Sequence, residues 1–224
     1  MTKSVEAKQV RVSDGDVRIV LPGTWVRVPL DSEEVATAYA KRLVKRQAGK
    51  ADRIARARRE AVLELVNSAR EAVNIGVHTY LMSLEILPGI PFPAALLLRD
   101  EDWPEASRPA LAEGDVAAAL TTAFPEIEVA EGRYGPVGRR WEMARHAVGE
   151  DDEEFQTLRL EYFVPHPSGS GVLMARANMS NVPSGEPFAT LFDEIIDSIT
   201  FPEPDEAGQG GETSPAQEPA VTSA

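Results

Sequence analysis

The stretch LRLEYFVPHPSGSGVLMARAN, residues 158–178, decides the fold of this chain. Its first part has the period of a half-buried β-strand, with apolar residues at alternate positions: Leu158, Leu160, Tyr162 and Val164. Turn-forming residues follow over 167–171, and a second strand is predicted over 172–178. Two strands joined by so short a turn pair antiparallel, so this stretch predicts an antiparallel sheet.

Other segments predict the remaining strands. The apolar residues from Val10 to Leu21 alternate around Asp14-Gly15, a strong signal for a β-hairpin. A turn at Pro22-Gly23-Thr24 leads into a short strand over 25–28. Further strands are predicted over 78–86, 92–98, 127–129 and 137–147.

Helices are predicted between and after these strands. A first helix begins at Asp31, with Glu34 completing a capping box, and a second runs over 51–74. Asp115 caps a short helix over 116–124. A closing helix, with Ser184 as its cap, has an apolar stripe at steps of three and four: Phe188, Leu191, Phe192, Ile195 and Ile199. The pattern predicts one α+β domain over residues 1–201, with a long helical segment at about 31–75.

Bulk composition narrows the class of protein. The chain has 224 residues, a formal net charge of −13 and no cysteine, so disulfides and thiolate chemistry are excluded. The sequence has neither an N-terminal secretory signal nor an apolar stretch long enough to span a membrane, and we expect a cytoplasmic protein. Residues 202–224 contain five acids, four prolines and no basic residue, which predicts a disordered acidic tail.

The most unusual feature is a basic stretch within the helical segment. Between Lys41 and Arg59 there are nine basic residues and one acid, Asp52. We expect either a contact surface for an acidic partner or a solvated helix face whose charges pair with acids elsewhere. An acidic tail folding back over the basic stretch is a third possibility. The candidate partner-binding residues are Lys41, Arg42, Lys45, Arg46, Arg53, Arg56 and Arg59.

No motif in the sequence indicates catalysis or cofactor binding. The three histidines, at 78, 146 and 166, lack the spacing of metal ligands. The acidic run over 150–154 lacks the spacing of a calcium loop, and we expect a solvated turn. The glycines over 169–171 lie between two strands rather than before a helix, so they do not predict a phosphate cradle. We therefore assign no catalytic residue, no cofactor and no metal.

A family resemblance is carried by three groups of residues. They are Leu21-Pro22-Gly23-Thr24-Trp25, then YFVPHP (162–167) with VLMARA (172–177), and finally LFDEIIDSI (191–199). With this order of elements, the chain resembles the PsbP-like proteins, and most nearly their LpqN-like bacterial members, over roughly residues 8–201. The resemblance implies an α/β/α sandwich, with helices on both faces of the sheet, and a non-catalytic role in binding or assembly. The absence of a secretory signal and of a lipid-anchoring cysteine argues against a surface lipoprotein.

These observations lead to a functional hypothesis. We expect a non-enzymatic binding or accessory module that acts through protein–protein contact, with no nucleic-acid binding at physiological salt because the net charge opposes it. The alternative is a small-molecule-binding domain or an unrecognised hydrolase with a pocket at the sheet edge. A polar pocket would favour the alternative, and an exposed apolar patch would favour the binding module.

Overall fold

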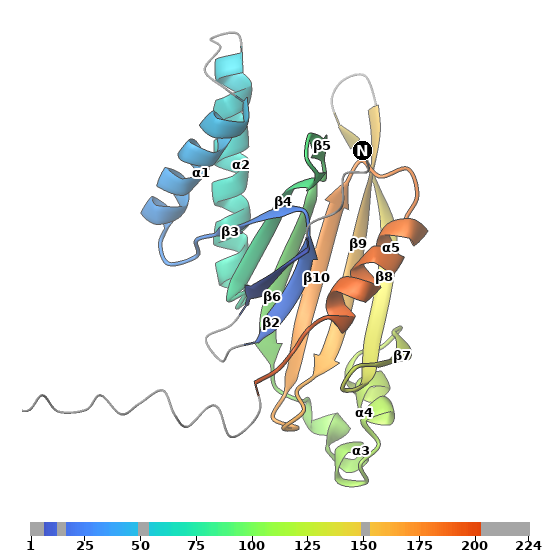
Figure 1. The fold of residues 1–224 in the computed structure, drawn as a ribbon. Helices are drawn as coiled ribbons and strands as arrows, with labels where there is room; N and C mark the ends of the chain where they lie inside the picture. Colours follow the sequence, from blue (N-terminus) through green and yellow to red (C-terminus); the bar gives the residue numbers. More distant parts are fainter. Residues whose placement is uncertain (1–6, 13–16, 49–53, 149–152, 203–224) are drawn as a thin grey trace, which may run out of the picture.

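The protein is built around an eight-stranded sheet in which all pairings are antiparallel (Figure 1). The computed structural model describes residues 7–12, 17–48, 54–148 and 153–202, without the side chains of 146–148 and 153–155. The strands lie side by side in the order β3 (Thr24–Val28), β4 (Thr79–Leu87), β6 (Ala94–Glu101), β10 (Val172–Ser180), β9 (Glu153–Pro165), β8 (Gly135–Val148) and β7 (Glu128–Gly132), and the short β5 (Ile90–Pro91) pairs with β4. The predicted α+β class with an antiparallel sheet is confirmed.

The first two strands form a small sheet of their own. β1 (Ala7–Arg11) pairs antiparallel with β2 (Arg18–Pro22), and the backbone N–H of Val12 donates to the carbonyl of Val17 at 2.8 Å. The predicted hairpin is therefore confirmed, although its turn at Asp14-Gly15 lies outside the described residues. After β2 the chain turns at Gly23, where φ is +80° and a β-carbon would overlap the backbone carbonyl oxygen of Glu85. Only glycine fits this position without strain.

In the part of the chain that the structure describes, five helices accompany the strands. They are α1 (Glu33–Ala48), α2 (Ala55–Asn74), α3 (Arg108–Ala112), which follows a short 3₁₀ turn, η2 (Glu105–Ser107), α4 (Val116–Ala123) and α5 (Glu186–Asp197). Each predicted helix is present within a few residues of its expected bounds, whereas α3 was not predicted. Within the described residues, no helix combines the length and the apolar character that a membrane span requires.

The helix starts confirm one predicted cap and correct two others. The side chain of Asp115 accepts a hydrogen bond from the Ala118 N–H at 2.9 Å, as predicted for α4. At α1, however, Ser32 rather than Asp31 accepts the hydrogen bond from the Val35 N–H, at 3.3 Å. At α5 no side chain caps the helix, and the residue at the cap is Gly185 rather than Ser184. Both predictions were wrong because several adjacent residues were chemically suitable caps, and the chain path decides among them.

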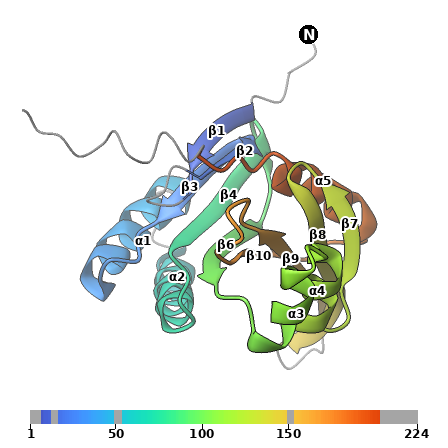
Figure 2. The same ribbon diagram turned by 90° about the horizontal axis from the view of Figure 1, so that it is seen from below.

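The core is divided according to the alternation of side chains along each strand. On β6, Ala94, Leu96 and Leu98 pack in the largest cluster together with α5. Their neighbours Ala95 and Leu97 pack instead in a second cluster, with α1 and α2. A third, smaller cluster joins α4 to Phe163 and Val172. In the end-on view of Figure 2, α2 and α4 lie at separate parts of the sheet.

The helices α1 and α2 form a hairpin that is only partly packed on the sheet. The buried residues of α1 are Ala36, Ala40 and Leu43, and those of α2 begin only at Leu65. The start of α2 therefore extends beyond the sheet, as Figure 1 shows. Arg56, Arg58 and Arg59 of the predicted basic stretch lie in this projecting part, whereas its Lys50 and Arg53 lie outside the described residues.

Candidate functional site

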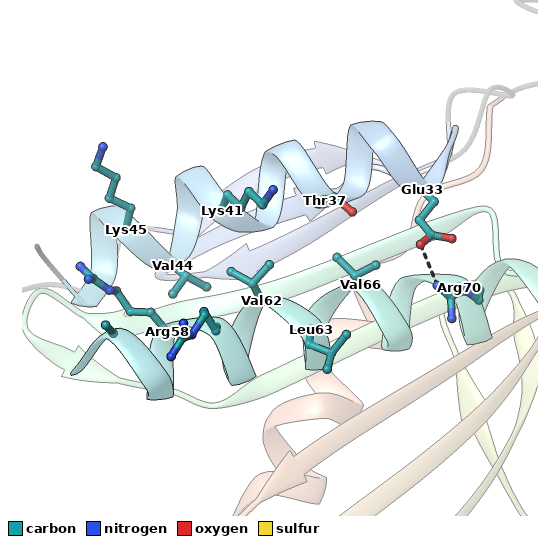
Figure 3. A pocket seen from close by; sticks show the side chains of 12 residues that line it. Glu33, Thr37, Lys41, Val44, Lys45, Arg58, Val62, Leu63, Val66 and Arg70 are labelled. Carbon is teal, nitrogen blue, oxygen red and sulfur yellow. Dashed lines mark hydrogen bonds and ion pairs between the residues drawn. The ribbon is translucent and has the colours of Figure 1, made fainter. Parts of the chain in front are cut away.

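A groove with a volume of about 720 Å³ runs between α1 and α2. Its apolar lining comes from Val44 on α1 and from Val62, Leu63 and Val66 on α2. Figure 3 shows Val44 pointing toward α2 and Val62 pointing toward α1. Leu63, one of these lining residues, is 61% exposed. The groove is thus an apolar surface that the chain itself leaves open.

Positive charge surrounds this apolar surface. The lining includes Lys41 and Lys45 from α1, and Arg58, Arg59 and Arg70 from α2. Among the described residues, Glu33 is the acid that lines the groove, and it accepts a hydrogen bond from Arg70 Nη2 at 2.8 Å. Because this ion pair occupies one end, the cations at the other end, near the tip of the hairpin, dominate the electrostatics of the groove.

The predicted partner-binding residues are divided among different surfaces. Lys41, Lys45 and Arg59 line the groove. Arg42 and Arg46 lie on another side of α1, near Tyr39, whose pKa is raised by burial and lowered in part by these two charges. Arg56 forms an exposed ion pair with Glu60, one helical turn away, at 2.7 Å. Arg53 lies outside the described residues. The sequence did not predict that Arg58 and Arg70 would join the groove.

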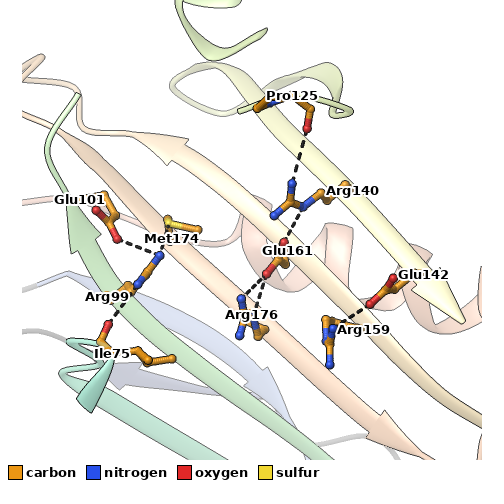
Figure 4. A network of polar contacts seen from close by, with 10 residues as sticks. All are labelled: Ile75, Arg99, Glu101, Pro125, Arg140, Glu142, Arg159, Glu161, Met174 and Arg176. Carbon is orange, nitrogen blue, oxygen red and sulfur yellow. Dashed lines mark hydrogen bonds and ion pairs between the residues drawn. The ribbon is translucent and has the colours of Figure 1, made fainter. Parts of the chain in front are cut away.

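A second polar site centres on a buried carboxylate, Glu161 of β9, which is only 6% exposed. Its Oε1 accepts hydrogen bonds from Arg176 Nε at 2.8 Å and Nη2 at 2.5 Å, and its Oε2 accepts from Arg140 Nε at 2.5 Å (Figure 4). Burial raises the pKa of Glu161, but the hydrogen bonds and charges of Arg140 and Arg176 outweigh it, so the pKa lies below its ordinary value of 4.5. The carboxylate is therefore ionised at neutral pH.

The register of the sheet builds this site. Glu161 lies directly opposite Arg140 of β8 and Arg176 of β10. In the next row, Arg159 lies opposite Glu142, and its Nη1 donates to the Glu142 carboxylate at 2.7 Å. These side chains alternate with the apolar residues that face the main core, so they point away from it. Opposite charges directly across strands stabilise the sheet.

The sequence analysis did not predict this polar site, although the sequence does show which residues of β9 occupy the polar positions. Arg159 and Glu161 occupy the polar positions between Leu158, Leu160 and Tyr162, which the alternation shows. Their partners Arg140 and Arg176 are 21 and 15 residues away from Glu161. Only the register of three strands brings them together.

Two histidines also meet an unexpected partner. His78 Nε2 lies 3.5 Å from one oxygen of Asp100, and His166 Nε2 lies 3.2 Å from the other. His146 is among the residues whose side chains are not described. Within the described residues, no group of three or more histidine, aspartate or glutamate side chains could hold a metal ion.

The comparisons with known proteins add no family. No family model matches the chain, and no match to a curated protein was found. The resemblance to PsbP-like proteins therefore rests on the sequence motifs alone. The class that the structure supports is an antiparallel α+β protein with a projecting basic helical hairpin.

Proposed function

We propose that this protein is a non-enzymatic binding module whose α1–α2 groove holds an acidic, amphipathic helix of a partner protein. The observation that supports this function is the combination of an apolar floor with a cationic border. Val44, Val62 and Leu63 provide the apolar contact, and the surrounding lysines and arginines select negative charge. The PsbP-like resemblance, with its non-catalytic binding roles, points the same way.

The shape of the groove favours a helix as the occupant. Two packed helices present a long furrow between them, into which the side chains of a third helix can insert. From Glu33 to Lys45 the lining of α1 extends for about 18 Å, which matches about twelve residues of helix. A partner helix of about three turns would therefore fill the groove.

The distribution of charge predicts the orientation of the partner. Glu33 and Arg70 already pair at one end, whereas Lys41, Lys45 and Arg59 form no ion pair within the described residues. We expect the acidic residues of the partner to lie at the end near the hairpin tip. The apolar floor and the overall charge of −13 both disfavour nucleic acid.

Fluorescence anisotropy with a labelled helical peptide of about twelve residues, carrying a leucine stripe flanked by glutamates, tests the proposal. A peptide of the same composition in scrambled order is the control for charge alone. We expect the patterned peptide to bind and Lys41→Glu/Lys45→Glu to weaken binding by about tenfold or more. Arg42→Glu/Arg46→Glu, which changes the same charge on the same helix outside the groove, should weaken it by less than about threefold.

Two results would contradict the groove as the binding site. One is equal binding of the patterned and scrambled peptides. The other is an equal loss of affinity in the two double variants, which would indicate long-range attraction to the whole hairpin. Leu63→Ser provides a test that leaves the charge unchanged, and it should also weaken binding because it removes apolar contact from the floor.

A further inference from the structure

A second cavity, with a volume of about 410 Å³, lies over the strands β8, β9 and β10. Glu161 lies among its lining residues, and the arginines around it are partly open to solvent. The side chains of Arg140, Arg159 and Arg176 are 42%, 47% and 40% exposed, against 7% for Glu161. The buried carboxylate therefore holds guanidinium groups that remain accessible to a ligand.

These arginines retain hydrogen-bonding capacity. Each guanidinium carries five N–H donors. Within the described residues, Arg159 donates from Nη1 alone, and Arg176 donates from Nε and Nη2 to Glu161 and from no other nitrogen. Arg140 donates to Glu161 and, at 3.5 Å, to the carbonyl of Pro125. The remaining donors form a surface suited to a carboxylate group.

Negative groups line the same cavity. Glu142 and Glu126 are both exposed lining residues, so the cavity holds as many acids as arginines. Glu126 has a φ of +63°, in the left-handed region that non-glycine residues rarely adopt. This strained turn follows Pro125, whose carbonyl accepts from Arg140, so the position of Glu126 is tied to the arginine cluster.

The stability of a solvated sheet face does not require a buried carboxylate between two arginines. A buried carboxylate with two arginines is often less stabilising than apolar residues of the same size, because removing the charges from water is costly. Beside this site, in the same strand as Arg176, the amide oxygen of Asn178 is buried without a hydrogen-bond partner in the described part of the chain. The cavity, the buried triad and the strained Glu126 together indicate a binding site.

We infer that this cavity binds a small zwitterion of the amino-acid or short-peptide class. The carboxylate of the ligand binds the free donors of Arg159 and Arg176, and its ammonium group binds Glu126 and Glu142. Arg159 and Arg176 keep free N–H donors, and Glu126 forms no ion pair within the described residues, so a ligand that carries both charges can bind both, whereas a simple anion or cation binds one alone. The volume is near the lower end for ligand sites and suits a small molecule.

The test is isothermal titration calorimetry of the full chain at low salt with the free amino acids and glycylglycine as probes. N-acetylglycine, which is only an anion, and glycinamide, which is only a cation, are the matched controls. We expect at least one zwitterion to bind about tenfold or more tightly than either singly charged control. Arg159→Met should reduce that affinity by at least about tenfold, and Glu126→Gln by at least about threefold.

Arg56→Met is the control variant, because it also removes an arginine with one glutamate partner but lies on the helical hairpin. It should bind the probe as the original chain does. Three results would overturn the inference: no zwitterion binds, N-acetylglycine binds equally well, or Arg56→Met loses as much affinity as Arg159→Met. Because the groove and this cavity share no lining residue, failure here leaves the proposed helix-binding function standing.

Discussion

Lys41 and Arg42 are neighbours in the chain, yet they lie on different surfaces of α1. Lys41 lines the groove against α2, whereas Arg42 lies outside it near Tyr39. Lys45 and Arg46 repeat this division one turn later, because residues four apart lie on the same side of a helix. The four basic residues of α1 therefore form two separate rows of charge.

Lys41 and Lys45 repel each other across one helical turn, and this repulsion predicts their effect on stability. We expect Lys41→Gln/Lys45→Gln to leave the free energy of unfolding unchanged or to raise it by up to about 0.5 kcal/mol. Urea denaturation measures the change, with Arg42→Gln/Arg46→Gln as the matched variant. A decrease of more than about 1 kcal/mol would show that the lysines are held by acids of the chain itself.

Phe192 is predicted to be a major contributor to stability. It is fully buried, and its ring lies 6.5 Å from those of Trp25 and Phe92. Phe192→Ala should reduce the free energy of unfolding by roughly 3–5 kcal/mol through lost transfer energy and the cavity left behind. Thr190→Ala, at an exposed position on the same helix, should change it by less than about 0.5 kcal/mol. A loss below about 1 kcal/mol at Phe192 would contradict the packing of α5.

Glu161 predicts a specific dependence of stability on pH. Its folded-state pKa lies below 4.5, so the ionised carboxylate stabilises the fold above that pH, and this contribution is lost as the pH falls through the folded-state pKa. Glu161→Gln should cost about 1–3 kcal/mol at neutral pH, since the two arginines stay partly hydrated, and should flatten the loss of stability below pH 4.5. Urea denaturation at several pH values measures both effects.

The exposed Glu142, which also pairs with an arginine, is the control for the substitution of Glu161. Glu142→Gln should change the free energy of unfolding by less than about 1 kcal/mol at neutral pH. A profile for Glu161→Gln as steep as that of the original chain would show that other carboxylates cause the acid sensitivity.

The end of the chain supplies a prediction about the minimal fold. Thr200 exchanges backbone hydrogen bonds with Arg18 of β2, and Phe201 packs near His166 and Tyr134. Removing residues 203–224 keeps both contacts. It should leave the melting temperature within a few degrees of that of the full chain, because the composition of these residues cannot support a core. Removing 199–224 instead should lower it by about 5 °C or more, since Ile199 is buried. A large decrease from the shorter deletion would show that the acidic tail packs on the domain.

The sequence by itself determined most of the strands and helices, although not α3 or the short β5, because their signals are local. The alternation of Leu158, Leu160, Tyr162 and Val164 placed these residues on one side of β9, and all four lie in the main core. The stripe on α5 likewise placed Phe192 and Ile195 in that core. A period of two or of 3.6 residues can be read along the chain because each residue's direction depends on its near neighbours.

Only the tertiary structure decided how these elements combine into sites. Glu161 meets Arg140 and Arg176 because three strands pair in one register, and a shift by one residue would turn each side chain to the other face. The groove likewise depends on how α1 lies against α2. This packing places Lys41 and Arg59 in the lining of one groove and leaves Arg42 outside it. Such long-range pairings follow from the packing of the whole core, so no local pattern in the sequence reports them.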